Sequence, residues 1–128
     1  KAIDLSIEKS KRNDFYEDEM IETILMNKIS QLSGGELRYL EIKLILSNPS
    51  KFVLLDEPYN GLSPIMIKKI NQLISENSNK KGIIITDHNY QNVIKISSKL
   101  ILLKECKAFH LKDKSELIEK GYLIEGMI

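Results

Sequence analysis

The sequence predicts an α/β fold with a parallel sheet, preceded by a helical region. Two short apolar runs, residues 52–55 and 83–86, are bounded by turn residues and are too short for core helices. Such runs are typical of buried strands. Between them, residues 64–76 carry apolar side chains at helical spacing. Strand, helix and strand in this order indicate a βαβ unit, in which the two strands are parallel.

The region before the first strand is predicted to be helical. Residues 14–26 carry apolar side chains at helical spacing, so we expect one helix there. Another helix begins after Ser33 and continues to about Ser47, because Asn48-Pro49-Ser50 follows and proline cannot continue a helix. Residues 1–13 are weakly patterned, and either a short extended segment or a frayed helix fits them.

The remaining elements are shorter. Ser63 followed by Pro64 is an N-cap with proline at the first helical position, which marks the start of the helix in the βαβ unit. Beyond the second strand, the sequence predicts a helix at 89–96, two strands joined by a turn at 100–103 and 108–111, and a last helix at 115–120.

Composition narrows the function classes. The chain has 128 residues, enough for one domain, and 19 Lys and Arg against 18 Asp and Glu give a net charge of +1. This balance provides no electrostatic basis for binding nucleic acid. The single Cys106 cannot form an internal disulfide and fits a reducing compartment. No apolar run reaches the ~18 residues that span a bilayer, so membrane association would require a partner.

The segment Leu32-Ser33-Gly34-Gly35-Glu36 contains a capping box, in which Ser33 and Glu36 exchange hydrogen bonds at a helix start. The two glycines leave backbone N–H groups uncovered at the positive end of the helix dipole. Such a helix start is suited to a phosphate group. An ordinary helix start after a Gly-Gly turn is the alternative for these five residues alone.

Polar residues end both predicted strands. Asp56 and Glu57 follow the first, and His88 follows the second. Ligands in open α/β sheets lie at the carboxyl ends of the strands. There Asp56 is suited to holding Mg²⁺, Glu57 to polarising a water as general base, and His88 to donating to a phosphate. The alternatives are a solvated carboxylate pair and a histidine that only forms a turn.

Taken in order, these segments resemble the second half of an ATP-binding cassette (ABC) transporter nucleotide-binding domain. Residues Leu32 to Glu36 resemble the signature motif, and residues 53–56 the Walker B strand. Glu57 resembles the catalytic glutamate, and His88 the switch histidine. Gly61, Leu62 and Ser63 resemble the D-loop, although Ser63 stands where the family usually has aspartate.

The resemblance implies part of a P-loop NTPase-type parallel sheet and part of an α-helical subdomain. Residues 1–48 would belong to the helical subdomain, 49–104 to the C-terminal part of the ATPase core, and 105–128 to a final strand and short helix. It further implies ATP and Mg²⁺ as cofactors, with Asp56 as metal ligand and with Glu57 and His88 as catalytic residues.

The resemblance also implies partners. In this family the signature residues contact the ATP of a second nucleotide-binding domain, so Leu32, Ser33, Gly34, Gly35 and Glu36 would act in trans. The second domain is a copy or a homologue, and the D-loop residues help to assemble the shared site. Transmembrane transporter subunits would place the protein on the cytoplasmic face of a membrane. No nucleic-acid partner is expected.

The phosphate-binding loop G-x-x-x-x-G-K-[ST] is absent, and no glycine is followed directly by lysine. We therefore expect the chain to be the C-terminal part of a longer protein. We expect this part alone neither to bind ATP tightly nor to hydrolyse it.

Three other readings stay open on sequence. One is a soluble two-cassette ATPase of translation, because the loop after Pro58 in this chain partly matches the corresponding loop of those proteins. A chromosome-maintenance ATPase is the second, although residues 1–31 show no sustained heptads. The third is a regulatory cassette that does not hydrolyse ATP, which Ser63 favours and which Glu57 and His88 oppose.

Overall fold

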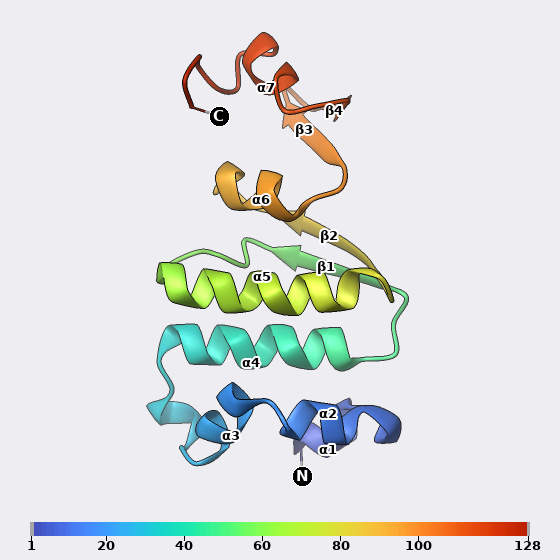
Figure 1. The fold of residues 1–128 in the computed structure, drawn as a ribbon, viewed down its shortest axis with the longest axis vertical. Helices are drawn as coiled ribbons and strands as arrows, with labels where there is room; N and C mark the ends of the chain where they lie inside the picture. The colour runs from blue at the N-terminus through green and yellow to red at the C-terminus, as the bar shows by residue number, and fades with distance from the viewer. Residues whose placement is uncertain (1, 128) are drawn as a thin grey trace. The chain divides into compact units, whose positions relative to one another are not determined.

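The computed structural model describes residues 2–127 of the chain, apart from the side chains of Ala2 and Ser6 (Figure 1). Contacts divide it into two units, Lys1–His88 and Asn89–Ile128. The first contains the helical region and the βαβ segment. The second contains a helix, a two-stranded antiparallel sheet and a short final helix.

The first unit has six helical segments before its first strand. They are α1 (Ala2–Ser6), the 3₁₀ turn η1 (Lys9–Lys11), α2 (Arg12–Tyr16), α3 (Glu19–Leu25), the 3₁₀ turn η2 (Ile29–Gln31) and α4 (Gly34–Ser47). Strand β1 (Phe52–Asp56), helix α5 (Pro64–Ser78) and strand β2 (Gly82–Thr86) follow. The predicted helix after Ser33 is confirmed, and so is the βαβ order.

The single helix expected over residues 14–26 is wrong, because the chain forms α2 and α3 with a break between them. Asp18 causes the break. Its backbone is extended, and its Oδ1 accepts hydrogen bonds from the N–H groups of Met20 at 2.9 Å and Ile21 at 3.2 Å. Asp18 is therefore an N-cap, which begins a new helix within a continuous apolar pattern.

The Asp18 carboxylate also ties α3 to α4. Its Oδ2 accepts from the Tyr39 hydroxyl at 2.7 Å and from the Lys43 ammonium. Burial alone would raise the pKa of Asp18, but the bonds from Lys43, Tyr39 and the Ile21 N–H outweigh it and lower that pKa. The ionised carboxylate therefore stabilises the folded helical region.

We predict that Asp18→Asn lowers the free energy of unfolding by about 2 kcal/mol at neutral pH, because hydrogen bonds to a charged acceptor are lost. The folded-state pKa of Asp18 is depressed, so its contribution is present above the ordinary value of 3.8 and is lost as the pH falls through the folded-state pKa. Urea unfolding at a series of pH values measures this difference. Asp14→Asn, at an exposed position of α2, is the matched control and should change stability by less than ~0.5 kcal/mol. Equal effects of the two variants would contradict the assignment.

Strands β1 and β2 are parallel, and the register pairs Phe52 with Gly82 and Asp56 with Thr86. Figure 1 shows α5 running alongside these strands and α4 running alongside α5. Val53 and Leu55 are buried, whereas Phe52 is 70% and Leu54 73% exposed. The expectation that both strands are buried is therefore wrong for the described residues, because α4 and α5 cover only one face of this two-stranded sheet.

A buried lysine holds the end of α4 beside the start of β2. Lys81 is 8% exposed, and its ammonium donates to the carbonyl oxygens of Asn48 and of Ser50, the latter at 3.0 Å. Burial lowers the pKa of Lys81, with a smaller contribution from the charge of Lys11. These bonds satisfy carbonyls that the helix end leaves without a partner.

The second unit contains α6 (Tyr90–Ile96), β3 (Leu100–Lys104), β4 (Lys107–Leu111) and α7 (Glu116–Glu119). Strands β3 and β4 are antiparallel, and the two-residue turn between them has positive φ at Glu105 and Cys106, as a tight hairpin requires. The predicted strands around a turn are confirmed. Leu102, Leu117 and Leu123 form its buried core.

Candidate functional site

The carboxyl ends of β1 and β2 bring together the polar residues that the sequence places after each strand. Asp56 ends β1 opposite Thr86, and the Thr86 hydroxyl donates to Asp56 Oδ1 at 2.5 Å. The remaining oxygen of the Asp56 carboxylate has no hydrogen bond within the described residues, and the residue is exposed. The threonine thus orients the carboxylate at the sheet edge while leaving an oxygen for a ligand.

Glu57 and His88 meet at the same edge. Glu57 Oε1 lies 3.7 Å from His88 Nδ1, and the two side chains are 51% and 70% exposed. The Glu57 backbone has φ of 44°, in the left-handed region, and its N–H donates to the Thr86 carbonyl at 2.7 Å. A non-glycine residue held in this region costs about 1 kcal/mol or more, and such strain clusters at functional sites.

The signature segment forms the N-terminus of α4, as expected. The Ser33 N–H donates to Glu36 Oε2 at 2.8 Å, and the Glu36 N–H donates to Ser33 Oγ at 3.2 Å. The capping box is therefore complete, and the Ser33 N–H lowers the pKa of Glu36. Leu32 precedes the cap with an extended backbone. A Cβ placed on Gly34 would meet nothing within 4 Å, so this face of the helix start is open.

The D-loop segment lies against the signature helix. A Cβ on Gly35 would lie 3.0 Å from Met66 Cγ of α5 and 3.8 Å from Leu62 Cδ2, so the start of α4 packs closely against the D-loop segment and the first turn of α5. Gly61 has φ of 70°, and Ser63 caps α5 by accepting from the Met66 N–H at 3.4 Å. The signature and D-loop segments are thus neighbours in the first unit.

Sequence reasoning missed Tyr59 and Asp87, which connect the loop after β1 to the end of β2. The Tyr59 N–H donates to Asp87 Oδ2 at 3.0 Å, and the Tyr59 hydroxyl donates to Asn71 Oδ1 at 2.6 Å. Tyr59 is 3% exposed and the Asp87 side chain 0%. Their positions beside Glu57 and His88 were the available signal, but a contact between residues this distant in sequence has no local pattern.

The side chains at the carboxyl ends of β1 and β2 fit a Mg²⁺ ion that is held partly by the protein and partly by the phosphates of a nucleotide. Within the described part of the chain, no group of three or more His, Cys, Asp or Glu side chains forms a metal cage. Mg²⁺ commonly takes one or two carboxylates together with phosphate oxygens and water. Asp56 supplies one such carboxylate, and it would be the residue that holds the metal.

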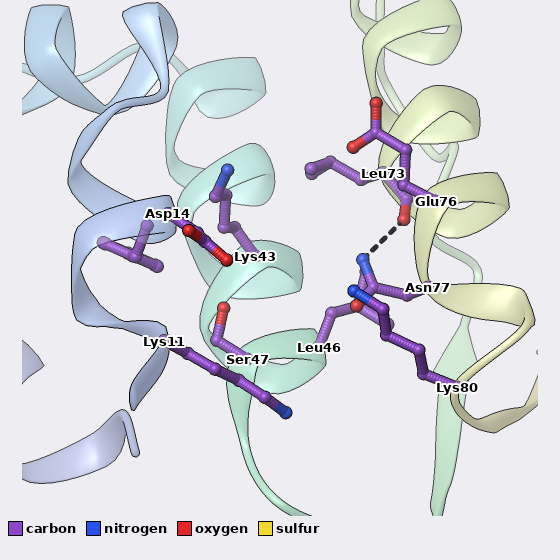
Figure 2. Close-up of a pocket in the computed structure, with 10 residues that line it drawn as sticks. Lys11, Asp14, Lys43, Leu46, Ser47, Leu73, Glu76, Asn77 and Lys80 are labelled. Carbon is purple, nitrogen blue, oxygen red and sulfur yellow. Dashed lines mark hydrogen bonds between the residues drawn. The ribbon is translucent and has the colours of Figure 1, made fainter. Parts of the chain in front are cut away.

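A separate cavity of about 220 Å³ lies between α2, α4 and α5 (Figure 2). It carries three ammonium and two carboxylate groups over an apolar floor that includes Phe15, Leu46 and Leu73. The dashed line in Figure 2 is the bond by which Asn77 Nδ2 donates to the Leu73 carbonyl at 2.8 Å. None of the predicted site residues lines this cavity, so it is distinct from the strand edge.

A βαβ unit with Asp-Glu and His at its carboxyl edge, beside a capped glycine-rich helix start, fits part of a P-loop NTPase-type domain. The chain is 34% identical over 96 residues to the lipopolysaccharide export system ATP-binding protein LptB of Haemophilus influenzae, covering 74% of this chain and 40% of that protein. It is 33% identical over 105 residues to LptB of Escherichia coli K12, covering 80% and 44%. To the phosphate import ATP-binding protein PstB 2 of Listeria monocytogenes it is 40% identical over 91 residues, covering 71% and 33%.

The chain belongs to the ABC transporter ATP-binding protein family. It spans less than half the length of each of these three relatives. No protein-family model matches it.

Solved structures share the fold. An archaeal ribosome recycling factor, aABCE1, superposes with a TM-score of 0.67 at 19% identity, over 86% of this chain and 22% of that one. The ADP conformation of an ATP-binding cassette of an ABC transporter superposes with a TM-score of 0.60 at 20% identity, over 81% and 47%. At these identities the likeness concerns the fold alone. Among the described residues, no helix has the length and apolar character required to cross a membrane.

Proposed function

We propose that this chain supplies the catalytic residues for ATP hydrolysis in an ABC ATPase, at the carboxyl ends of β1 and β2. The observation that carries the proposal is the 3.7 Å approach of Glu57 Oε1 to His88 Nδ1 at the ends of two parallel strands. Glu57 accepts the proton of the attacking water as general base. His88 donates a hydrogen bond to the γ-phosphate, where charge develops in the transition state.

Asp56 complements these two residues by holding Mg²⁺, with its carboxylate oriented by Thr86. Bound Mg²⁺ would neutralise charge on the phosphates of the nucleotide. Because Asp56 and Glu57 are adjacent at the end of a strand, the metal ligand and the base are held by the same piece of backbone. The edge thus supports phosphoryl transfer to water, provided that a phosphate-binding loop completes the site.

The signature segment serves a different nucleotide in this proposal. Gly34 and Gly35 present backbone N–H groups and the dipole of a 14-residue helix beside the Ser33 side chain, and the surface over Gly34 is open. These groups would bind the γ-phosphate of ATP held by a second cassette, whether a copy or a homologue. ATP would then join two cassettes, and its hydrolysis would release them.

The D-loop segment supports the same arrangement, since Leu62 packs beside Gly35. Ser63 caps α5 but brings no charge in place of the usual aspartate. We propose that Gly61, Leu62 and Ser63 shape the boundary between the two nucleotides and that the uncharged Ser63 weakens their coupling.

We further propose that hydrolysis drives transport across a membrane, with transmembrane subunits as partners on the cytoplasmic face. The support comes from relatives whose names describe lipopolysaccharide export and phosphate import. Since these two processes run in opposite directions, no direction of transport follows for this chain. Co-purification of the complete protein with transmembrane subunits, and vanadate-sensitive transport in reconstituted vesicles, test this proposal.

We predict that residues 1–128 alone bind Mg-ATP with an affinity weaker than about 100 µM, because no Gly-Lys phosphate loop is present to hold the phosphates. Isothermal titration calorimetry measures this directly. A complete cassette is the positive control. Micromolar affinity or phosphate release by residues 1–128 would show that another segment binds the nucleotide.

A further inference from the structure

We propose that Asp87 is a positioning residue that clamps the loop after β1, at Tyr59, onto the end of β2 and so holds Glu57 beside His88. This proposal depends on the function proposed above only for the experiments that measure ATP turnover. The clamp itself consists of contacts between residues of the first unit.

Two hydrogen bonds fasten the chain to β2 immediately after β1. The Glu57 N–H donates to the Thr86 carbonyl at 2.7 Å, and the Tyr59 N–H donates to Asp87 Oδ2 at 3.0 Å. Pro58 lies between them, is fully buried and has no N–H to donate. The first bond involves only backbone, so Asp87 is the side chain on which this attachment depends.

The attachment holds a strained segment. Glu57 keeps φ of 44°, a conformation that a non-glycine residue leaves unless its surroundings enforce it. Bonds on both sides of Pro58 enforce it here. Loss of the Asp87 carboxylate would remove the backbone bond on the downstream side and let the Glu57 backbone relax, which would move its carboxylate away from the histidine.

A second anchor makes the clamp rigid. The Tyr59 side chain is 3% exposed, and its hydroxyl donates to Asn71 Oδ1 at 2.6 Å, which ties the same loop to the middle of α5. The Asp87 side chain is wholly buried, and its Oδ1 lies 3.9 Å from His88 Nδ1. A single carboxylate therefore touches the loop that begins at Glu57 and adjoins the switch histidine.

The test combines amide exchange on this chain with turnover of the complete cassette. In Asp87→Ala, we expect the Tyr59 amide to exchange roughly tenfold faster or more, because it loses its acceptor. Amides within β1 and β2 should keep their rates. Asp87→Asn should restore protection, since the amide oxygen also accepts a hydrogen bond.

In the complete cassette, Asp87→Ala should lower kcat for ATP by about tenfold to a hundredfold with little change in KM, as expected for a misplaced base. Asp87→Asn should recover most of this loss. Asp18→Asn is the control for destabilisation alone, because the hydrogen bonds of Asp18 are made within α3 and to α4, away from the loop after β1 and from the end of β2. It should leave kcat unchanged.

The clamp would be overturned by unchanged Tyr59 protection in Asp87→Ala, by a uniform rise in exchange across β1 and β2, or by an equal loss of kcat in Asp18→Asn. A failure of Asp87→Asn to recover kcat while restoring protection would also overturn it, since charge rather than position would then matter. Unchanged turnover in Glu57→Gln would instead reject the proposed function and leave the exchange result standing.

Discussion

Glu57→Gln is expected to lower phosphate release from Mg-ATP by about 10²- to 10⁴-fold in the complete cassette, because it removes the general base. Glutamine keeps the size of the side chain, and the backbone bond from the Glu57 N–H to Thr86 does not depend on the side chain. ATP should therefore still bind. Since the nucleotide is no longer consumed, the two-cassette assembly should accumulate in ATP.

A malachite-green or coupled assay measures phosphate release, and size-exclusion chromatography with ATP measures assembly. Glu22→Gln, an exposed position on α3, is the matched control and should retain the parental rate. If Glu57→Gln also retains it, another group activates the water. If the parental protein neither binds nor hydrolyses ATP, the regulatory reading of the cassette replaces the hydrolytic one.

His88→Ala is expected to lower kcat by about 10²-fold, the usual cost of losing one preorganised donor at a developing charge. His88 lies at the edge with its ring 70% exposed, so its removal should leave the fold intact. The loss should fall mainly on kcat, because the contact strengthens in the transition state. Steady-state kinetics of the complete cassette separate kcat from KM.

His110→Ala is the matched control, since His110 is exposed on β4, which belongs to the second unit. It should leave both kinetic parameters unchanged. Equal losses in the two histidine variants would indicate a general effect on folding, and no loss in His88→Ala would remove the histidine from the site.

Much of the first unit could be predicted because its signals are local. The capping box at Ser33 and Glu36 fixes the start of α4, and Ser63 with Pro64 fixes the start of α5. Short apolar runs located β1 and β2, and polar residues at their ends located the candidate edge. In each case the deciding residues lie within a few positions of one another.

The features that were missed depend on contacts across the chain. Asp18 breaks the helix expected over residues 14–26, and its carboxylate is satisfied partly by Tyr39 and Lys43 of α4. A period of 3.6 residues carries no information about that capping role. The exposure of Phe52 and Leu54 was missed for a related reason, because an apolar run does not reveal which face of a sheet is covered.

The candidate edge shows the same division. The residues Asp56, Glu57 and His88 could be predicted from their places after strands, whereas the approach of Glu57 to His88 required the register of β1 on β2. The contact of Tyr59 with Asp87 likewise depends on how the loop after β1 folds over β2. Side-chain identity predicted the chemistry, and tertiary structure decided which groups meet.

The central claim is that Asp56, Glu57 and His88 act on one bound nucleotide, whereas the signature segment of the same chain contacts a second nucleotide held by another cassette. Mixing two inactive variants of the complete cassette tests it most directly. One carries Glu57→Gln, and the other carries Ser33→Arg, which blocks the signature. In a mixed pair, one nucleotide still meets an intact Glu57 edge from its own cassette and an intact signature from the other. Phosphate release should therefore reappear on mixing and rise well above that of either variant alone. No recovery, in a mixture shown to form mixed pairs, would contradict the claim.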